Sequence, residues 1–336
     1  EAIVSVAQKS FGKEMAMIMF FAMVINIMIA RFTPWKFIFL TGHHTLFMSM
    51  MVAVILATAG MTGITLIAVG SLVVGVAMVF FPAIAHPYMK KVTGSDDVAI
   101  GHFSTLSYVL AGFIGSKFGN KEHSTEDMNV PKSLLFLRDT PVAISFTMSI
   151  IFLVTCLFAG ADAVKELSGG KNWFMFSIMQ SITFAAGVYI ILQGVRMVIA
   201  EIVPAFKGIS DKLVPNARPA LDCPVVFPYA PNAVLVGFLS SFAAGLIGMF
   251  TLYLLNMIVI IPGVVPHFFV GAAAGVFGNA TGGRRGAILG AFAQGLLITF
   301  LPVFLLPVLG DIGFANTTFS DADFGVLGIL LGIIVR

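Results

Sequence analysis

Long hydrophobic stretches, interrupted by glycine, proline and histidine, limit what this chain can fold into. Of its 336 residues, 58% are hydrophobic and 10% are charged, and the mean hydropathy is +1.01. A soluble domain carries roughly 25% charged residues. We therefore expect a polytopic membrane protein, and the composition excludes a disordered chain or a disulfide scaffold. The net charge of +3 is too small to indicate nucleic acid, so the expected partner of the basic residues is the lipid bilayer.

Several stretches approach the roughly 20 apolar residues that a transmembrane helix needs. They cover about 15–30, 46–81, 141–160, 173–200, 233–261, 286–310 and 325–335. The second is long enough for two spans, with a break expected at Gly60, Gly63 and Gly70. The predicted fold class is all-α, with residues 1–336 forming one membrane-embedded domain. The missing initiator Met and the abrupt end at Arg336 predict that the first N-terminal spans and the C-terminal end are absent.

Three further apolar stretches contain too many helix breakers for a plain span: 32–45, 98–116 and 262–283. Non-helical backbone at membrane depth is tolerated only where protein or a water-filled cavity covers it. We expect re-entrant or broken segments here, and such segments are typical of a transporter's substrate path. Two of them contain a Gly-His pair, Gly42-His43 and Gly101-His102, which favours an internal repeat unless the dipeptides match by chance.

Charge and breaker residues also predict local features. Arg284-Arg285 flank a predicted span whose other end has acids but no Lys or Arg, so the positive-inside rule places them in a cytoplasmic turn. The run 222–233 has three prolines in eight residues and cannot be regular helix.

Asp222 is the first candidate for a substrate contact. A carboxylate beside Leu221 and Pro224 is costly in apolar surroundings unless it faces a cavity or a partner. It could accept hydrogen bonds from substrate hydroxyls. Alternatively, it could be structural, paired with Arg218 or accepting backbone N–H groups.

His43 and His102 are the next candidates. An imidazole can hydrogen-bond a polyhydroxylated ring and accept a proton from an attacking hydroxyl. The glycine before each histidine would let backbone and ligand approach closely. A structural role is the alternative for both, and His44 is a further candidate. Gln193 could line a cavity or form an interhelical hydrogen bond. We expect no metal and no cofactor, because no cluster offers three or four ligands at convergent spacing.

A set of short motifs resembles the ascorbate-type membrane component, enzyme IIC, of the bacterial phosphotransferase system. The similar segments follow in order from about residue 15 to residue 290, and they are Leu40-Thr-Gly-His43, Ile100-Gly-His102, Gln193-Gly-Val-Arg-Met197, Phe206-Lys-Gly-Ile-Ser210, Leu221-Asp-Cys223, Ala230-Pro-Asn-Ala-Val234, Ile261-Pro-Gly263 and Gly275-Val-Phe277 with Asn279.

The resemblance implies a homodimeric, multi-pass permease of the bacterial inner membrane, with a core domain that carries the substrate and a scaffold domain that holds the dimer. It implies an elevator-like movement and phosphorylation of an ascorbate-like sugar acid or polyol by a separate IIB component, itself supplied by IIA. The chain would not be an enzyme, and Cys223 would not be the phosphorylated cysteine. Thr41, His43, His44, His102, Gln193 and Asp222 would line the site.

The chain departs from the ascorbate-specific pattern in two places. Those members have Gln shortly after each Gly-His, where this chain offers His44, Thr45 and Phe47 after the first pair and Phe103 after the second. Both changes remove amide groups from the expected sugar site, so the substrate stays open among sugar acids, sugars and polyols. Two other classes remain: an ion-coupled secondary transporter using Asp222 or Glu201, and an intramembrane enzyme, which lacks a recognisable nucleophile with an adjacent base.

Overall fold

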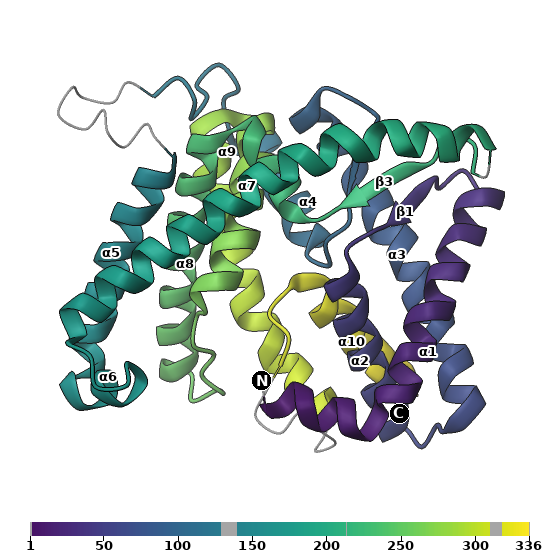
Figure 1. Ribbon diagram of the computed structural model, residues 1–336, viewed down its shortest axis with the longest axis horizontal. Coiled ribbons are helices and arrows are strands. Elements are labelled where there is room, and N and C mark those ends of the chain that lie inside the picture. Colours follow the sequence, from purple (N-terminus) through teal and green to yellow (C-terminus); the bar gives the residue numbers. More distant parts are fainter. Residues whose placement is uncertain (1, 129–139, 213, 310–317, 336) are drawn as a thin grey trace. The chain divides into compact units, whose positions relative to one another are not determined.

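A computed structural model describes residues 2–128, 140–212, 214–309 and 318–335 (Figure 1). The chain divides into two compact units, one of residues 1–125 and 199–336 and one of residues 126–198. The smaller unit contains α5 (Thr140–Ala159), α6 (Ala161–Leu167) and the first part of α7 (Trp173–Lys212). In chain order, the larger unit contains α1 (Ala2–Phe32), β1 (Phe37–Phe39), α2 (Gly42–Thr58), α3 (Gly63–Thr93), β2 (Ala99–Ile100), α4 (Thr105–Phe118), β3 (Arg218–Leu221), the 3-10 helix η2 (Cys223–Tyr229), α8 (Pro231–Leu254), α9 (Val264–Leu309) and α10 (Ala322–Val335).

Five helices of the described chain are long and apolar enough to cross a membrane, which confirms the predicted helical, polytopic class. They are α1 from Phe11, α3, α7 as far as Ile191, α8 and α9. The predicted break in 46–81 lies between α2 and α3, where Gly60 and Gly63 have φ of 85° and 55°. Gly70 is not part of it. That residue lies inside α3, where a Cβ would stand 2.6 Å from Ile18 Cδ1, so it lets α1 pack closely.

A small parallel sheet in the larger unit was not predicted. Its strands lie in the order β1-β3-β2, with Phe37 opposite Arg218 and Ile100 opposite Leu221. Strands of two to four residues, buried on both faces, leave no alternating pattern in the sequence. The broken backbone expected in 32–45 and 98–116 is present as strand and loop at 33–41 and 98–104, whereas residues 42–45 begin α2 and residues 105–116 belong to α4. A helix–strand–helix order occurs twice, around β1 and around β2, which supports an internal repeat.

The third predicted break, 262–283, is placed wrongly over most of its length. Helix α9 begins at Val264 and continues past it, with non-helical backbone at Gly282 and at Gly283, whose φ is 59°. Arg284-Arg285 consequently lie inside α9, just after its kink, and not in a turn. The segment after α4 holds the kink in place: the Asn120 N–H donates to the Gly282 carbonyl at 2.8 Å, and the Arg284 N–H donates to the His123 carbonyl at 2.7 Å.

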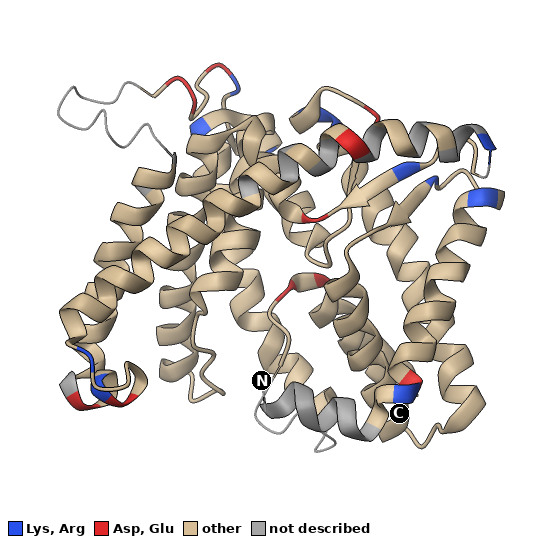
Figure 2. Cartoon of the chain, in the orientation of Figure 1, with Lys and Arg blue, Asp and Glu red and all other residues tan. Residues whose placement is uncertain are grey.

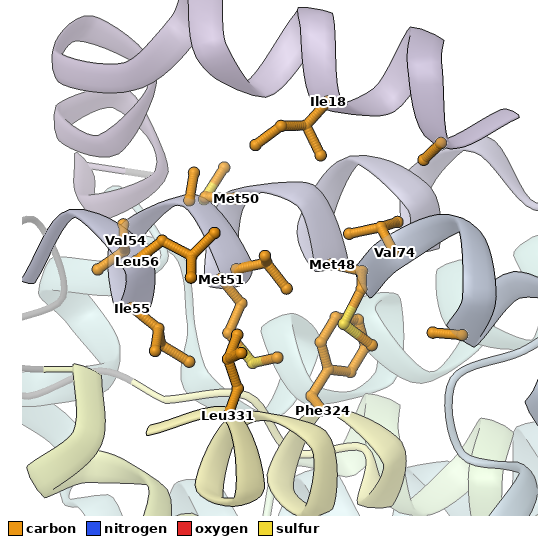
Figure 3. Packing of buried hydrophobic residues seen from close by; sticks show 14 of the residues in the cluster. Ile18, Met48, Met50, Met51, Val54, Ile55, Leu56, Val74, Phe324 and Leu331 are labelled. Carbon is orange, nitrogen blue, oxygen red and sulfur yellow. The ribbon is translucent and has the colours of Figure 1, made fainter. Parts of the chain in front are cut away.

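The core of the larger unit lies among α1, α2, α3 and α10. Met48, Met51 and Leu56 of α2 pack between Ile18 of α1 and Leu331 of α10, among other apolar side chains (Figure 3). In a lipid environment such contacts stabilise through dispersion and close fit, because the bilayer is as apolar as the core. Small residues serve the same purpose between α8 and α9. A Cβ at Gly237 would stand 2.3 Å from the Gly271 carbonyl oxygen.

Candidate functional site

The predicted histidines and the aspartate lie at the carboxyl ends of the three parallel strands. His43 and His44 follow β1, His102 follows β2 and Asp222 follows β3. Because parallel strands end at one edge of a sheet, residues far apart in sequence converge there, as ligand sites of open parallel sheets do. Figure 2 shows an acidic segment at the end of β3 and another at the start of α10, both surrounded by uncharged chain.

Asp222 uses its two carboxylate oxygens differently. Oδ1 accepts from His102 Nδ1 at 2.7 Å and from the Cys223 N–H at 2.7 Å. Oδ2 lies 3.6 Å from His43 Nε2, and the Asp222 and His43 side chains are 35% and 56% exposed. The His102 ring is buried behind them. A ligand from solvent would therefore meet Asp222 Oδ2 and His43, while His102 and the backbone hold the carboxylate in place.

The structural alternative for Asp222 is half right. Its Oδ1 does accept a backbone N–H, but Arg218 is not its partner. The Arg218 guanidinium at the start of β3 instead pairs with Asp96, which also pairs with Lys90 at 2.7 Å. This pairing lies at the opposite end of β3 from Asp222, because Arg218 is the first residue of that strand.

His44 and Thr41 are buried behind the accessible groups. The His44 ring lies between the rings of His43 and His102, with centroids 4.6 and 4.0 Å away, and the Phe103 N–H points at its Nδ1 from 3.4 Å. The Thr41 hydroxyl donates to the Gly101 carbonyl at 2.5 Å. Thr41 therefore ties the two Gly-His loops together, which favours a positioning role over direct contact with a ligand.

We expected the glycine of each Gly-His pair to let backbone and ligand approach closely, but the surroundings of the two glycines differ. A Cβ at Gly101 would stand 2.3 Å from the Ala220 carbonyl oxygen, so this glycine lets β2 lie against β3. At Gly42, no heavy atom of the described chain lies within 4 Å of the corresponding position, apart from its chain neighbours and the nearby backbone of α2 itself. The sequence match between the dipeptides thus hides two different local requirements.

Two acidic residues before and at the start of α10 belong to the same cluster, and the sequence analysis missed them. Asp323 accepts from the Thr105 N–H at 2.8 Å, the Leu106 N–H at 2.9 Å and the Thr105 hydroxyl at 2.5 Å. Its carboxylate satisfies donors of the first turn of α4 and complements the helix dipole. Asp321 Oδ2 lies 4.0 Å from His102 Nε2. Acids opening an apolar helix were the available signal.

The protonation of the groups at the end of β3 follows from burial and hydrogen bonding. Asp222 and Cys223 lie outside the membrane-spanning helices. Burial alone would raise the pKa of Asp222, but the hydrogen bond from His102 and the nearby imidazoles outweigh it and hold the pKa below its ordinary value. Burial raises the pKa of the Cys223 thiol to about 12. Cys223 is therefore a neutral thiol, unlike the low-pKa thiolates of reactive cysteines.

We predicted no metal site because the sequence showed no cluster of three or four ligands at convergent spacing. That premise was wrong. The structure brings together three overlapping sets whose ligand atoms lie within 4.8 Å of one another: His43, His44 and Asp222; His44, His102 and Asp321; and His102, Asp222 and Cys223. Their members come from distant segments, so no local spacing could reveal them. Gln193 lies on α7 in the smaller unit, and its role in binding stays a prediction.

Comparison with known proteins supports the resemblance. The family described as the sugar-specific permease component of the phosphotransferase system, EIIC-GAT, matches residues 1–323. A Mycoplasma pneumoniae (strain ATCC 29342 / M129 / Subtype 1) protein, described as an ascorbate-specific EIIC component of that system, is 30% identical over 232 residues, which are 60% of this chain and 34% of that protein. The chain thus spans about a third of its relative's length. With the family matched over nearly the whole chain, this protein belongs to the sugar-specific permease (EIIC) family of the phosphotransferase system.

Proposed function

We propose that the protein carries ascorbate, or a related small sugar acid or polyol, across the bacterial inner membrane. The observation that carries this proposal is the strand-end cluster, in which Asp222 Oδ2 and His43 remain accessible while Oδ1 is fixed by His102 and Cys223. A fixed carboxylate oxygen is a strong acceptor for a sugar hydroxyl. The description of the Mycoplasma relative supports ascorbate as the first ligand to test.

The buried wall of the site bears on the choice of substrate. Phe103 stands where ascorbate-specific members carry Gln, and its buried ring stacks on Phe39 at 4.6 Å between centroids. This part of the wall offers no amide to a ligand. Discrimination would then rest on few hydrogen bonds, chiefly those of Asp222 and His43, so the site would accept a polyol without a carboxylate as well as a sugar acid.

Transport would be coupled to phosphorylation by a separate protein. A substrate hydroxyl would attack the phosphorus of a phosphocysteine on a IIB component. The O–P bond would form, the P–S bond would break, the thiolate would leave with IIB, and the hydroxyl proton would pass to the accessible imidazole of His43. A IIA component would recharge IIB. The buried cysteine of the site, Cys223, supports this division of labour, because its thiol is neutral and is not the low-pKa thiolate that phosphotransfer needs. Phosphorylation would trap the product inside by adding charge.

The movement would be elevator-like, in a homodimer. The compact unit that contains the strand-end cluster would be the transport part, and residues 126–198 would belong to the scaffold. This assignment rests on family resemblance and on the division of the chain into two units.

Binding to the purified protein tests the proposal. A panel of ascorbate, galactitol, pentitols, hexoses and sugar acids would be screened by thermal shift against wild type, Asp222→Asn and the control Asp127→Asn, an exposed acid outside the cluster. We expect one ligand class to stabilise wild type and Asp127→Asn but not Asp222→Asn. Equal stabilisation of all three proteins would remove Asp222 from the site.

An ion-coupled secondary transporter is the second candidate, favoured by the buried acids Asp321 and Asp323. Uptake into vesicles separates the two mechanisms. Accumulation that requires phosphorylated IIB supports the phosphotransferase route. Accumulation driven by a proton or sodium gradient, without soluble proteins, would replace it.

A further inference from the structure

Two polar atoms, one on His102 and one on Asp321, face each other across a short gap in the buried part of the cluster. His102 uses its Nδ1 to hydrogen-bond Asp222 Oδ1 at 2.7 Å, so Nε2 is the ring nitrogen that remains to be satisfied. That nitrogen is buried and has no hydrogen-bond partner among the described residues. It lies 4.0 Å from Asp321 Oδ2, whose side chain is 17% exposed. At this distance the two atoms do not hydrogen-bond each other, and a buried polar atom without a partner calls for a bridging ligand, either a water molecule or a cation.

His44 completes a three-sided arrangement around this gap. Its ring centroid is 4.0 Å from that of His102, and the ligand atoms of His44, His102 and Asp321 lie within 4.8 Å of one another. Two imidazole nitrogens and one carboxylate oxygen form a ligand set typical of Zn²⁺. We propose that His44, His102 and Asp321 bind a divalent cation of the zinc class, a site distinct from the accessible face of Asp222.

The surroundings of His102 favour metal binding. Metal-ligating histidines usually donate their second ring N–H to a carboxylate, which fixes the tautomer and raises the basicity of the ligating nitrogen. Asp222 does this for His102 at 2.7 Å. Asp222 would thus serve the cation through its bond to His102 while its Oδ2 stays available to the substrate.

The remaining adjustments are small. Zinc holds nitrogen and oxygen ligands at about 2.1 Å, so His102 Nε2 and Asp321 Oδ2 would approach each other by roughly half an ångström. His44 would ligate through Nε2 with its proton moved to Nδ1. That change gives up the contact from the Phe103 N–H, which at 3.4 Å is already long for a hydrogen bond.

The test is metal titration of the full-length protein, purified in detergent with a tag that contains no histidine and freed of metal by EDTA. Zn²⁺ binding is measured by calorimetry. Co²⁺ binding is measured by the visible absorption of the ion, which is strong when Co²⁺ has a low coordination number. No substrate is present, so the result is independent of the proposed transport function. We expect one ion per chain, and Asp321→Asn or His102→Gln to weaken binding at least about 10-fold.

Two histidines outside the proposed set provide matched controls. His123→Gln removes an exposed histidine far from β2 in sequence, and His43→Gln removes the accessible histidine of the cluster. Both should keep wild-type affinity. Size-exclusion profiles and melting temperatures without metal establish that each variant is folded. A variant that fails this check is replaced by Asp321→Glu or His102→Ala.

Three outcomes would overturn the site. If wild type does not bind Zn²⁺ stoichiometrically, there is no cation site. The gap between His102 and Asp321 would then be filled by a water molecule or a substrate hydroxyl. Binding unchanged in folded Asp321→Asn and His102→Gln would place the ion on surface histidines. Binding lost in His43→Gln but kept in Asp321→Asn would move the ion to the accessible set of His43, His44 and Asp222.

Discussion

At the scale of single residues, the two oxygens of Asp222 separate structure from binding. Asp222→Asn keeps the shape and one acceptor oxygen for Cys223 and His102, but removes the charge next to His43. A hydrogen bond to a charged group contributes about 1.5–3 kcal/mol, so substrate affinity should fall about 10- to 100-fold. Calorimetry with the ligand found in the panel measures this, with Asp127→Asn as the variant that should match wild type. Unchanged affinity would assign Asp222 a purely structural role.

Asp323 is a residue whose contribution we expect to be stability alone. Its carboxylate accepts three hydrogen bonds from Thr105 and Leu106 at the start of α4. Asp323→Asn weakens all three and leaves buried donors poorly satisfied, so unfolding free energy should drop by about 1–3 kcal/mol. Thermal melting in detergent checks this against Asp162→Asn, an exposed acid in the first turn of α6. A melting temperature equal to that of wild type would show that water replaces the carboxylate without loss.

At the scale of elements, the two helix–strand–helix segments should respond differently to the same substitution. Gly101→Ala places a methyl group against the backbone of β3, at 2.3 Å from the Ala220 oxygen, whereas Gly42→Ala meets no described atom within 4 Å. We expect Gly101→Ala to destabilise by about 1–3 kcal/mol and to weaken ligand binding, because it displaces His102. Gly42→Ala should stay within about 0.5 kcal/mol of wild type. Equal melting temperatures for the two variants would contradict the close approach of β2 to β3.

At the scale of the whole molecule, the orientation in the membrane follows from helix α3. Its 31 residues extend about 46 Å, more than the roughly 30 Å of hydrocarbon, so we expect Thr62 and Lys91 on opposite sides of the bilayer. Lys90 and Lys91 in its last turn favour the cytoplasm for that end. A membrane-impermeant thiol reagent should label Thr62→Cys in intact cells and Lys91→Cys only in inverted vesicles. The native Cys156 and Cys223 are buried and provide the unlabelled background. The reverse labelling pattern would invert the assigned topology.

The class of this protein could be predicted from its amino-acid sequence. Hydropathy fixed the helical, membrane-spanning character, because the cost of exposing polar backbone to lipid leaves few alternatives. It also located the break at Gly60 and Gly63, and the short motifs identified the family together with His43, His102 and Asp222 as site candidates. These features are local, and local patterns can be read along a chain.

The way in which those candidates meet could not be predicted and is seen in the folded chain. The parallel sheet rests on pairing between β1, β3 and β2, which lie more than a hundred residues apart at their extremes, and strands this short carry no periodic signal. For the same reason the partners of each polar group could not be read from spacing. Arg218 pairs with Asp96 and leaves Asp222 to His102, and Asp321 joins His44 and His102 from the far end of the chain. Contacts between distant segments depend on packing in three dimensions, which a linear pattern does not contain.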